Sequence, residues 1–256
     1  PLREYWLASG KDLWKPGSPQ RMIHTRDDDG VRVVTLSRPD ARNALTLDGL
    51  DALATAVEAS PESVVLVRGA GEAFCAGADL ATVAEVATDA DRARAFIDRG
   101  QETMTRIEQA APVVVAGIDG PARGGGVELA LACDVRVATP DATLAEPGVT
   151  FGLFGAWGGT VRLPEAVGTT HANDLSLSGR VVDADEARSM GLVSRVVADP
   201  RTVADELAAN DSGALRALGR LGSHRGSTAD RERAEREAFV SQLRAHADAL
   251  AEHRNR

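Results

Sequence analysis

The sequence predicts an α/β fold whose C-terminal part is helical. From about Met22 onward, short β-branched runs alternate with amphipathic stretches, a pattern typical of strands and helices packed in layers. The run Pro112–Ile118 is apolar almost throughout, as expected of a strand buried on both faces of a sheet. Beyond about Gly155 the pattern is mainly helical, so a helical layer is expected to follow the core.

The spacing of apolar residues and the positions of helix-capping and strand-breaking residues predict the individual elements. Pro39 breaks the first apolar run, and Thr46 can cap a helix that continues to about Ala59. The predicted strands are Val31–Leu36, Ser63–Arg68, Pro112–Ile118, Val135–Ala138, Ala142–Ala145 and Leu192–Val197. The further predicted helices are Ala90–Gln109, Val127–Ala132 and about Ala229–Ala251.

The first 21 residues differ in character from the rest. Both lysines (Lys11 and Lys15), the only tyrosine and two of the three tryptophans lie there. We interpret residues 1–21 as an atypical N-terminal extension, an upstream segment or an expression remnant, and exclude them from the fold prediction. The expected organisation is a core over residues 22–198 and a helical region over residues 199–256.

Composition excludes several classes of function. A net charge of −9 opposes nucleic acid or an anionic membrane as partner, because both need a basic surface. No apolar run is long enough to span a bilayer and no secretory leader pattern is present, so a cytoplasmic protein is expected. Cys75 and Cys133 form no CxxC pair, and we interpret them as small buried apolar residues. The five histidines lack metal-ligand spacing, so no metal site is expected.

Two glycine-containing junctions between loop and helix carry the chemical signal. They are Ala73–Leu80, after a predicted strand, and Gly120–Leu129, after the apolar strand. Glycine lets the backbone approach a ligand closely, and the second junction enters a helix whose first N–H groups are unpaired. Two N–H groups converging from separate loops form an oxyanion hole, worth about 3–4 kcal/mol per donor. The alternative is that these glycines only form tight turns.

With further motifs, these junctions resemble the enoyl-CoA hydratase/isomerase (crotonase) superfamily. The order and spacing agree from about Met22 to Val197. The motifs are Leu36–Pro39 with Arg42–Leu45, Ala73–Leu80, Gly124–Leu129 with Cys133 and Asp134, Gly158 and Gly159 with Arg162 and Leu163, and Ala184–Ala187 with Gly191–Val193.

The resemblance implies a crotonase-like spiral of ββα turns with a helical C-terminal trimerisation region, assembled as a homotrimer or dimer of trimers. It implies an acyl-CoA thioester as substrate, with CoA arriving as part of that substrate and no separate cofactor. It assigns the oxyanion hole to the backbone N–H groups of Ala78 and Gly125. Nearby Ala76, Leu80, Gly124 and Gly148 are expected to contact the substrate.

The resemblance matches Glu128 to the first of two glutamates that activate and deliver water in typical hydratases. Glu128 lies three residues after Gly125, about one helical turn from the oxyanion donor. Burial there should raise its pKa into a range suited to acid/base work. The alternative is a first-turn glutamate that only complements the helix dipole.

The second glutamate is absent, because Gly148 stands at its position after Pro147. Glu146 lies two residues earlier and, on an extended segment, would share the direction of residue 148. We interpret Glu146 as a surface or supporting residue, with substitution for the missing glutamate as the alternative. Water addition by the two-glutamate route is therefore in doubt, whereas one acid/base suffices to isomerise a double bond.

Two further residues are candidates for substrate binding. Asp79 either lines the entrance of the site or caps the following helix. Arg42 is either a surface residue or a contact to a CoA phosphate, since arginine suits bidentate phosphate binding.

The predicted function is acyl-CoA chemistry of the enoyl-CoA hydratase/isomerase type, with Ala78 and Gly125 stabilising the enolate and Glu128 as the single acid/base. One alternative is a decarboxylase or hydrolase of acyl-CoA in the same superfamily. Another is an acyl-CoA-binding protein without turnover, since a fold alone does not establish activity.

Overall fold

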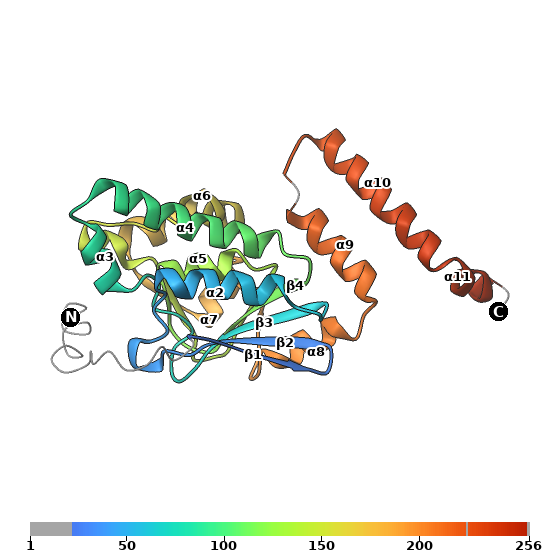
Figure 1. Cartoon of the computed structure of the whole chain (residues 1–256), viewed down its shortest axis with the longest axis horizontal. Coiled ribbons are helices and arrows are strands. Elements are labelled where there is room, and N and C mark those ends of the chain that lie inside the picture. Colours follow the sequence, from blue (N-terminus) through green and yellow to red (C-terminus); the bar gives the residue numbers. More distant parts are fainter. Residues whose placement is uncertain (1–21, 224, 255–256) are drawn as a thin grey trace.

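A computed structural model describes residues 22–223 and 225–254, and a six-stranded sheet lies at its centre (Figure 1). Its order is β1-β2-β3-β4-β6-β9; β1 is antiparallel to β2, and every other neighbouring pair is parallel. The strands are β1 Ile23–Asp28, β2 Val31–Leu36, β3 Val64–Gly69, β4 Val113–Ile118, β6 Val135–Ala138 and β9 Arg195–Val196. All six residues of β4 are buried, which confirms the prediction of a doubly covered strand.

A second, three-stranded sheet holds the segments that form the site. It consists of β5 Ala122–Arg123, β7 Thr143–Ala145 and β8 Val181–Asp183, with β5 parallel to β7. The register pairs Arg123 with Ala145, and Gly124 N–H donates to the Ala145 carbonyl at 3.0 Å. The chain therefore leaves both strands side by side, one toward helix α5 and the other toward Glu146.

Helices cover both faces of the large sheet. In Figure 1, α2, α4, α5 and α6 lie together above the strands, and α8 packs Val203 and Ala204 against the other face of the sheet. The helices are α2 Leu47–Glu58, α3 Leu80–Val86, α4 Ala90–Glu108, α5 Gly125–Leu131, α6 Gly159–Ser178, α7 Ala184–Ser189, α8 Arg201–Ala208, α9 Ser212–Ser223, α10 Thr228–Ala245 and α11 Ala247–Arg254, with 3-10 turns η1 Pro39–Ala41 and η2 Pro147–Phe151. In the described part of the chain, no helix has the length and apolar character needed to cross a membrane.

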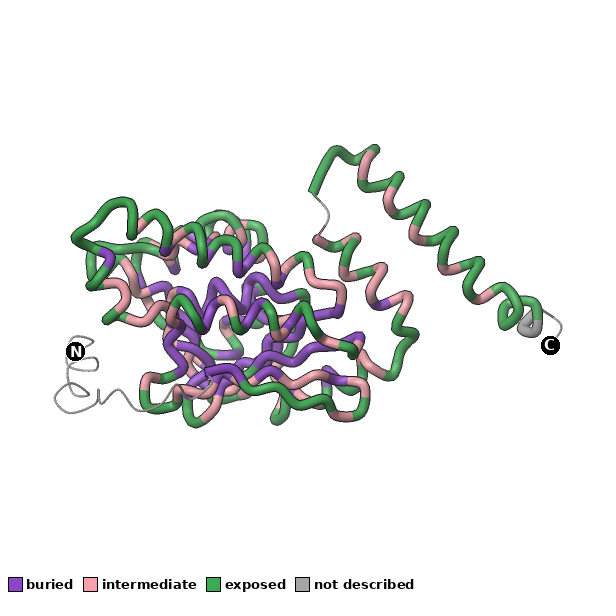
Figure 2. Tube along the Cα trace, in the orientation of Figure 1, coloured by how far each residue is buried: buried purple, intermediate pink, exposed green. Residues whose placement is uncertain are grey.

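The core divides into two apolar clusters, one on each face of the sheet. The larger includes Leu50 and Leu53 of α2 and Met104 and Ile107 of α4, all nearly inaccessible. The smaller packs Val203 and other residues of α8 and α9 against the opposite face. Figure 2 shows this burial concentrated in the sheet and in the helices directly above it.

The predicted elements recur in the structure, with different bounds where tertiary contacts decide. The last predicted strand is shortened to Arg195–Val196, and the α5 helix begins at Gly125 rather than Val127. The predicted C-terminal helix is interrupted after Ala245. The two-residue strand β5 has no periodicity to detect. The unpredicted β1 is an edge strand whose central residues are exposed and polar, so it lacks the alternation that marks a half-buried strand.

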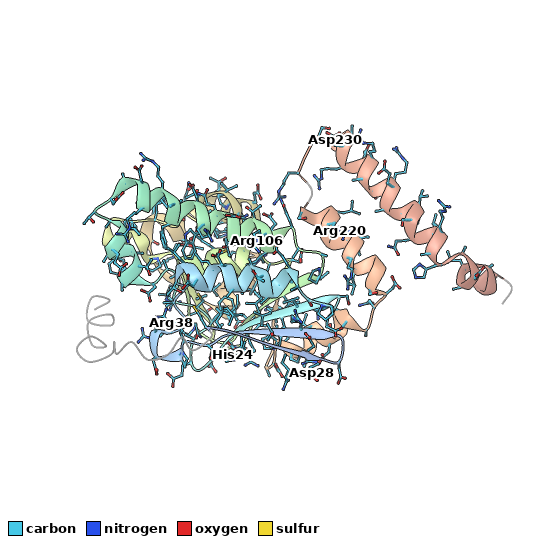
Figure 3. The ribbon with its side chains drawn as sticks, in the orientation of Figure 1. His24, Asp28, Arg38, Arg106, Arg220 and Asp230 are labelled. Atoms are coloured by element: carbon cyan, nitrogen blue, oxygen red, sulfur yellow. The ribbon has the colours of Figure 1, made fainter. Side chains whose placement is uncertain are left out.

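The C-terminal helices project from the core. No residue of α10 is buried, and in Figure 3 its side chains, from Asp230 onward, lie away from the sheet and its covering helices. Large apolar side chains are exposed along it, among them Phe239 at 63% and Val240 at 48%. This arrangement agrees with the predicted role of residues 199–256 in oligomerisation, which stays a proposal. The predicted extension, residues 1–21, lies outside the described residues.

Both cysteines are buried thiols and are expected to be unreactive in the folded protein. Burial raises the pKa of the Cys75 thiol to about 12 and also raises the pKa of Cys133, so neither forms the reactive thiolate at pH 8. A chromogenic disulfide reagent should therefore titrate no thiol in the native protein and two in denaturant. Fast reaction of either thiol without denaturant would contradict this packing.

Candidate active site

A cavity of about 300 Å³ lies between α3, α4, α5 and the segment that follows β7. Glu128, Glu146 and Arg123 are the charged residues of its wall, and Ala78 and Gly125 line it beside them. The predicted substrate contacts Ala76, Leu80, Gly124 and Gly148 also line it. Most of the remaining wall is apolar, and its large side chains are Val83, Val86, Phe96, Ile97, Phe151, Leu153, Phe154 and Trp157.

The two predicted oxyanion donors lie close together at a glycine contact. A Cβ atom on Gly77 would sit only 2.8 Å from the Gly125 nitrogen and 2.6 Å from the Arg123 carbonyl oxygen. Gly77 also has a φ of +88°, a conformation that favours glycine. Because Ala78 follows Gly77 directly, the Ala78 and Gly125 N–H groups belong to adjoining backbone segments. Within the described residues, neither N–H donates a hydrogen bond to the protein.

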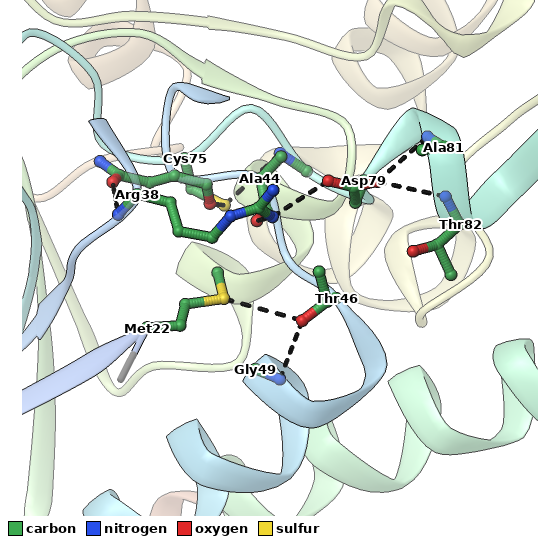
Figure 4. A network of polar contacts seen from close by, with 11 residues as sticks. Met22, Arg38, Ala44, Thr46, Gly49, Cys75, Asp79, Ala81 and Thr82 are labelled. Atoms are coloured by element: carbon green, nitrogen blue, oxygen red, sulfur yellow. Dashed lines mark hydrogen bonds and ion pairs between the residues drawn. The ribbon is translucent and has the colours of Figure 1, made fainter. Parts of the chain in front are cut away.

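Asp79 holds the loop that carries Ala78. Its Oδ1 accepts from the Ala81 and Thr82 N–H groups at 3.0 and 3.1 Å, and its Oδ2 accepts from Arg38 at 3.0 Å (Figure 4). Arg38 also donates to the Ala44 carbonyl at 2.7 Å. Asp79 is therefore the N-cap of α3 and does not line the cavity, which favours the capping interpretation over the entrance interpretation.

Glu128 reaches the cavity from the first turn of α5 and is held by backbone donors. Its Oε1 accepts from the Trp157 and Gly159 N–H groups, both at 2.7 Å, and the residue is 3% exposed. Burial raises the pKa of Glu128, while the two N–H donors and the Arg162 guanidinium oppose that rise. Two charge-assisted hydrogen bonds favour the ionised form, so Glu128 can serve as a base.

Glu146 is a buried cavity residue, so the prediction of a surface residue is wrong, whereas a supporting role and substitution for the missing glutamate both stay open. It is 6% exposed, and within the described residues its Oε1 has no hydrogen-bond partner. Burial, together with the nearby negative charge of Glu128, raises the pKa of Glu146 to about 8. The physical cause of the correction is the β5–β7 pairing, which turns the residue after Ala145 toward α5.

The glycines around the two carboxyl groups supply space. A Cβ atom on Gly155 would lie 3.0 Å from Oε1 of Glu128 and 3.2 Å from Oε2 of Glu146. The separation of these two oxygens therefore cannot exceed the sum of those distances. A Cβ atom on Gly148 would lie 2.9 Å from the Phe154 Cα, so the backbone after η2 occupies the space that a larger residue at position 148 would need.

A second, larger cavity adjoins the first on the side of the small sheet. It measures about 710 Å³ and includes Arg42, one of the predicted binding residues, together with Arg123. Ala76, Arg123 and Pro147 line both cavities, so the two spaces meet at the junction that carries Ala78. Arg42 therefore lies in the larger cavity, Glu128 and Glu146 lie in the more apolar one, and Arg123 lies between the two.

Sequence reasoning missed Trp157 and the spacing role of Gly155. The backbone N–H of Trp157 donates a hydrogen bond to Glu128. A Cβ atom on Gly125 would lie only 2.5 Å from the Trp157 ring. The cluster of glycines at positions 155, 158 and 159 was the available signal. Within residues 22–223 and 225–254, no group of three or more His, Cys, Asp or Glu is arranged to hold a metal ion.

Comparison with known sequences identifies one family. The sequence model of the Enoyl-CoA hydratase/isomerase family matches residues 26–218. A short-chain-enoyl-CoA hydratase of Clostridium acetobutylicum is 39% identical over 172 residues, which is 65% of each chain. A crotonyl-CoA hydratase of Syntrophomonas wolfei is 39% identical over 176 residues, or 66% of each. The aligned segment thus spans slightly less than two thirds of these relatives.

Solved structures extend the similarity to most of the chain. An enoyl-CoA hydratase from Thermoplasma volcanium matches with a TM-score of 0.82 and 30% identity, covering 90% of this chain and 96% of that one. A Thermobifida fusca protein assigned as an enoyl-CoA hydratase, solved in complex with acetoacetyl-CoA, matches with a TM-score of 0.77 and 31% identity. It covers 88% of this chain and 95% of its own. The spiral fold expected from the sequence is therefore confirmed.

The contact between Gly77 and Gly125 can be tested against a matched glycine. Gly152 has a similar φ of +74° but open space at its Cβ position, so Gly152→Ala should cost about 1–2 kcal/mol of unfolding free energy from backbone strain. Gly77→Ala should cost about 1–3 kcal/mol more, because its methyl group meets the Arg123 and Gly125 backbone. Urea unfolding of both variants measures the difference, and equal costs would show that the contact is not tight.

Proposed function

Because the chain belongs to the enoyl-CoA hydratase/isomerase family, we propose that it is an enzyme acting on acyl-CoA thioesters through an enolate. The observation that carries the proposal is the polar wall of the 300 Å³ cavity. There, Ala78 and Gly125, whose N–H groups donate to no acceptor within the described residues, line the same cavity as Glu128, a buried and hydrogen-bonded carboxylate. Enolate chemistry requires hydrogen-bond donors that stabilise the oxyanion and a group that transfers a proton.

The thioester oxygen would accept hydrogen bonds from the Ala78 and Gly125 N–H groups. Orphaned donors in a partly buried site are costly to maintain, so their retention supports a ligand oxygen at this position. As the substrate becomes an enolate, negative charge grows on that oxygen and both hydrogen bonds strengthen. The Gly77 contact fixes the two donors relative to each other before the substrate arrives.

Glu128 would transfer the proton to or from the acyl chain. Its carboxylate lies one helical turn from the Gly125 donor, and the Trp157 and Gly159 N–H groups fix its orientation. Burial raises its pKa, which brings the carboxyl group closer to the pH at which it must exchange a proton.

The two adjoining cavities suit the two halves of an acyl-CoA. The apolar cavity would take the acyl chain, and the larger cavity with Arg42 and Arg123 would take part of the CoA, including phosphate. Local arginines matter because the chain carries a net charge of −9, which would otherwise repel an anionic ligand. The exposed apolar side chains of α10 are proposed to form the contacts of a homotrimer or a dimer of trimers.

The proposal is tested by incubating the protein with 2-enoyl-CoA and 3-enoyl-CoA in deuterated water. Chromatography and mass spectrometry should reveal thioesters that have gained water, moved their double bond or exchanged hydrogen for deuterium. Glu128→Gln should lower these rates by about 100-fold or more, because the amide can keep the backbone contacts but cannot act as a base. Glu102→Gln, an exposed change on α4, is the control and should leave the rates unchanged.

Other outcomes select the alternatives. Release of carbon dioxide from a malonyl-type thioester, or of free CoA, without enoyl chemistry would replace this proposal with a decarboxylase or a hydrolase. Binding of acyl-CoA without any turnover, unaffected by Glu128→Gln, would identify a binding protein.

A further inference from the structure

A second carboxyl group faces the cavity and has no role in the chemistry assigned to Glu128. Glu146 is 6% exposed, and its Oε1 lacks a partner in the described part of the chain. Its Oε2 and Oε1 of Glu128 both lie near one point, the Cβ position of Gly155, at 3.2 and 3.0 Å. Gly155 is not among the glycines with positive φ, so space, rather than backbone conformation, accounts for a glycine between the two carboxyl groups.

The backbone makes position 146, rather than position 148, the source of this second carboxyl group. Parallel pairing of β5 with β7 continues into the hydrogen bond from Gly124 N–H to the Ala145 carbonyl. Glu146 therefore leaves the small sheet beside the start of α5, the helix that carries Glu128. At Gly148, the Leu153 and Phe154 backbone lies 2.9–3.1 Å from where a Cβ atom would be, so a glutamate there would displace that segment.

The surroundings of the two carboxyl groups favour opposite protonation states. Glu128 accepts hydrogen bonds from two backbone N–H groups, and the positive charge of Arg162 on α6 lowers the pKa of Glu128. Within the described residues Glu146 has no such donor, and burial together with the charge of Glu128 raises its pKa. Arg123, the other charged residue of the cavity wall, donates to the Thr143 carbonyl at 2.7 Å and the Thr143 hydroxyl at 2.9 Å. Two nearby carboxyl groups in such different surroundings divide into a base and an acid.

We propose that Glu146 is the proton donor of a hydration reaction on 2-enoyl thioesters and acts in place of the glutamate missing at position 148. This inference rests on the proposed enolate function of the same cavity. The water oxygen forms a bond to C3 while Glu128 takes one of its protons. The C2–C3 π electrons move to C2, with charge shared by the oxygen held by Ala78 and Gly125. C2 then takes the proton of Glu146, leaving Glu146 ionised and Glu128 protonated.

A small cavity beside Glu146 offers a route by which the residue can regain its proton without passing the substrate. A separate cavity of about 30 Å³ adjoins Glu146 on the side of Thr160 and Ser176. That volume is large enough for a water molecule between polar groups. Through it, Glu146 regains a proton from solvent while Glu128 releases the one it took, and the site returns to its starting state.

The test measures hydration of a short 2-enoyl-CoA by the full-length protein, using the loss of the enoyl thioester absorbance. Glu146→Gln should lower kcat by about 100-fold or more and leave KM within about threefold, because the amide keeps the shape but cannot give up a proton. The wild-type kcat/KM should fall as the pH rises through about 8, where Glu146 ionises. Glu102→Gln on exposed α4 is the matched control for a lost carboxylate.

Each outcome is decisive. Hydration by Glu146→Gln within about threefold of wild type, or a wild-type rate that does not fall between pH 7 and 9, overturns the role of Glu146 but leaves the enolate function intact. A wild-type protein that isomerises enoyl-CoA without adding water likewise overturns only the role of Glu146. A wild-type protein with no activity on any enoyl thioester overturns the proposed function itself. If Glu146→Gln does not fold, the wild-type pH profile still decides.

Discussion

The site depends on an unequal distribution of hydrogen bonds between two carboxyl groups buried around one cavity. Removing a charged carboxylate from water is costly unless donors replace the lost hydration. Among the residues that the structure describes, such donors reach Glu128, through the Trp157 and Gly159 N–H groups, and not Glu146. Glu146 is buried nearby, no donor of the described residues reaches it, and burial together with the charge of Glu128 raises its pKa. In the proposed mechanism, this difference makes one of two chemically identical side chains the base and the other the proton donor.

The surrounding fold maintains this difference through glycines and strand register. Side chains at Gly155 or Gly159 would occupy the space of the Glu128 carboxyl group, and the pairing of β5 with β7 brings Glu146 beside α5. Gly77 lets the Ala78 loop approach Gly125, and the N–H groups of Ala78 and Gly125, which have no acceptor in the described part of the chain, belong to residues that line the same cavity. Sites where buried polar groups lack hydrogen-bond partners are expected to be functional.

The sequence predicted features determined by local pattern and missed those determined by pairing between distant segments. The α/β core with its doubly covered strand, the Thr46 cap and the junction of Ala78, Gly125 and Glu128 are visible in periodicity or motif, whereas the Asp79 cap was one of two alternatives. Glu146 is different, because its burial follows from short strands whose pairing no spacing reveals. The backbone that excludes a side chain at Gly148 belongs to residues 153 and 154, so the compensation between positions 146 and 148 became visible only in three dimensions.

The most direct test of this account is infrared spectroscopy of the carboxyl groups as a function of pH. The account predicts a carbonyl band from a protonated carboxylic acid at pH 7, which disappears with a midpoint of about 8 and is absent from Glu146→Gln. Glu128→Gln should leave the band in place and move its midpoint downward, because the repelling charge is gone. If wild-type protein shows no such band at pH 7, or if Glu146→Gln retains it, the central claim is contradicted.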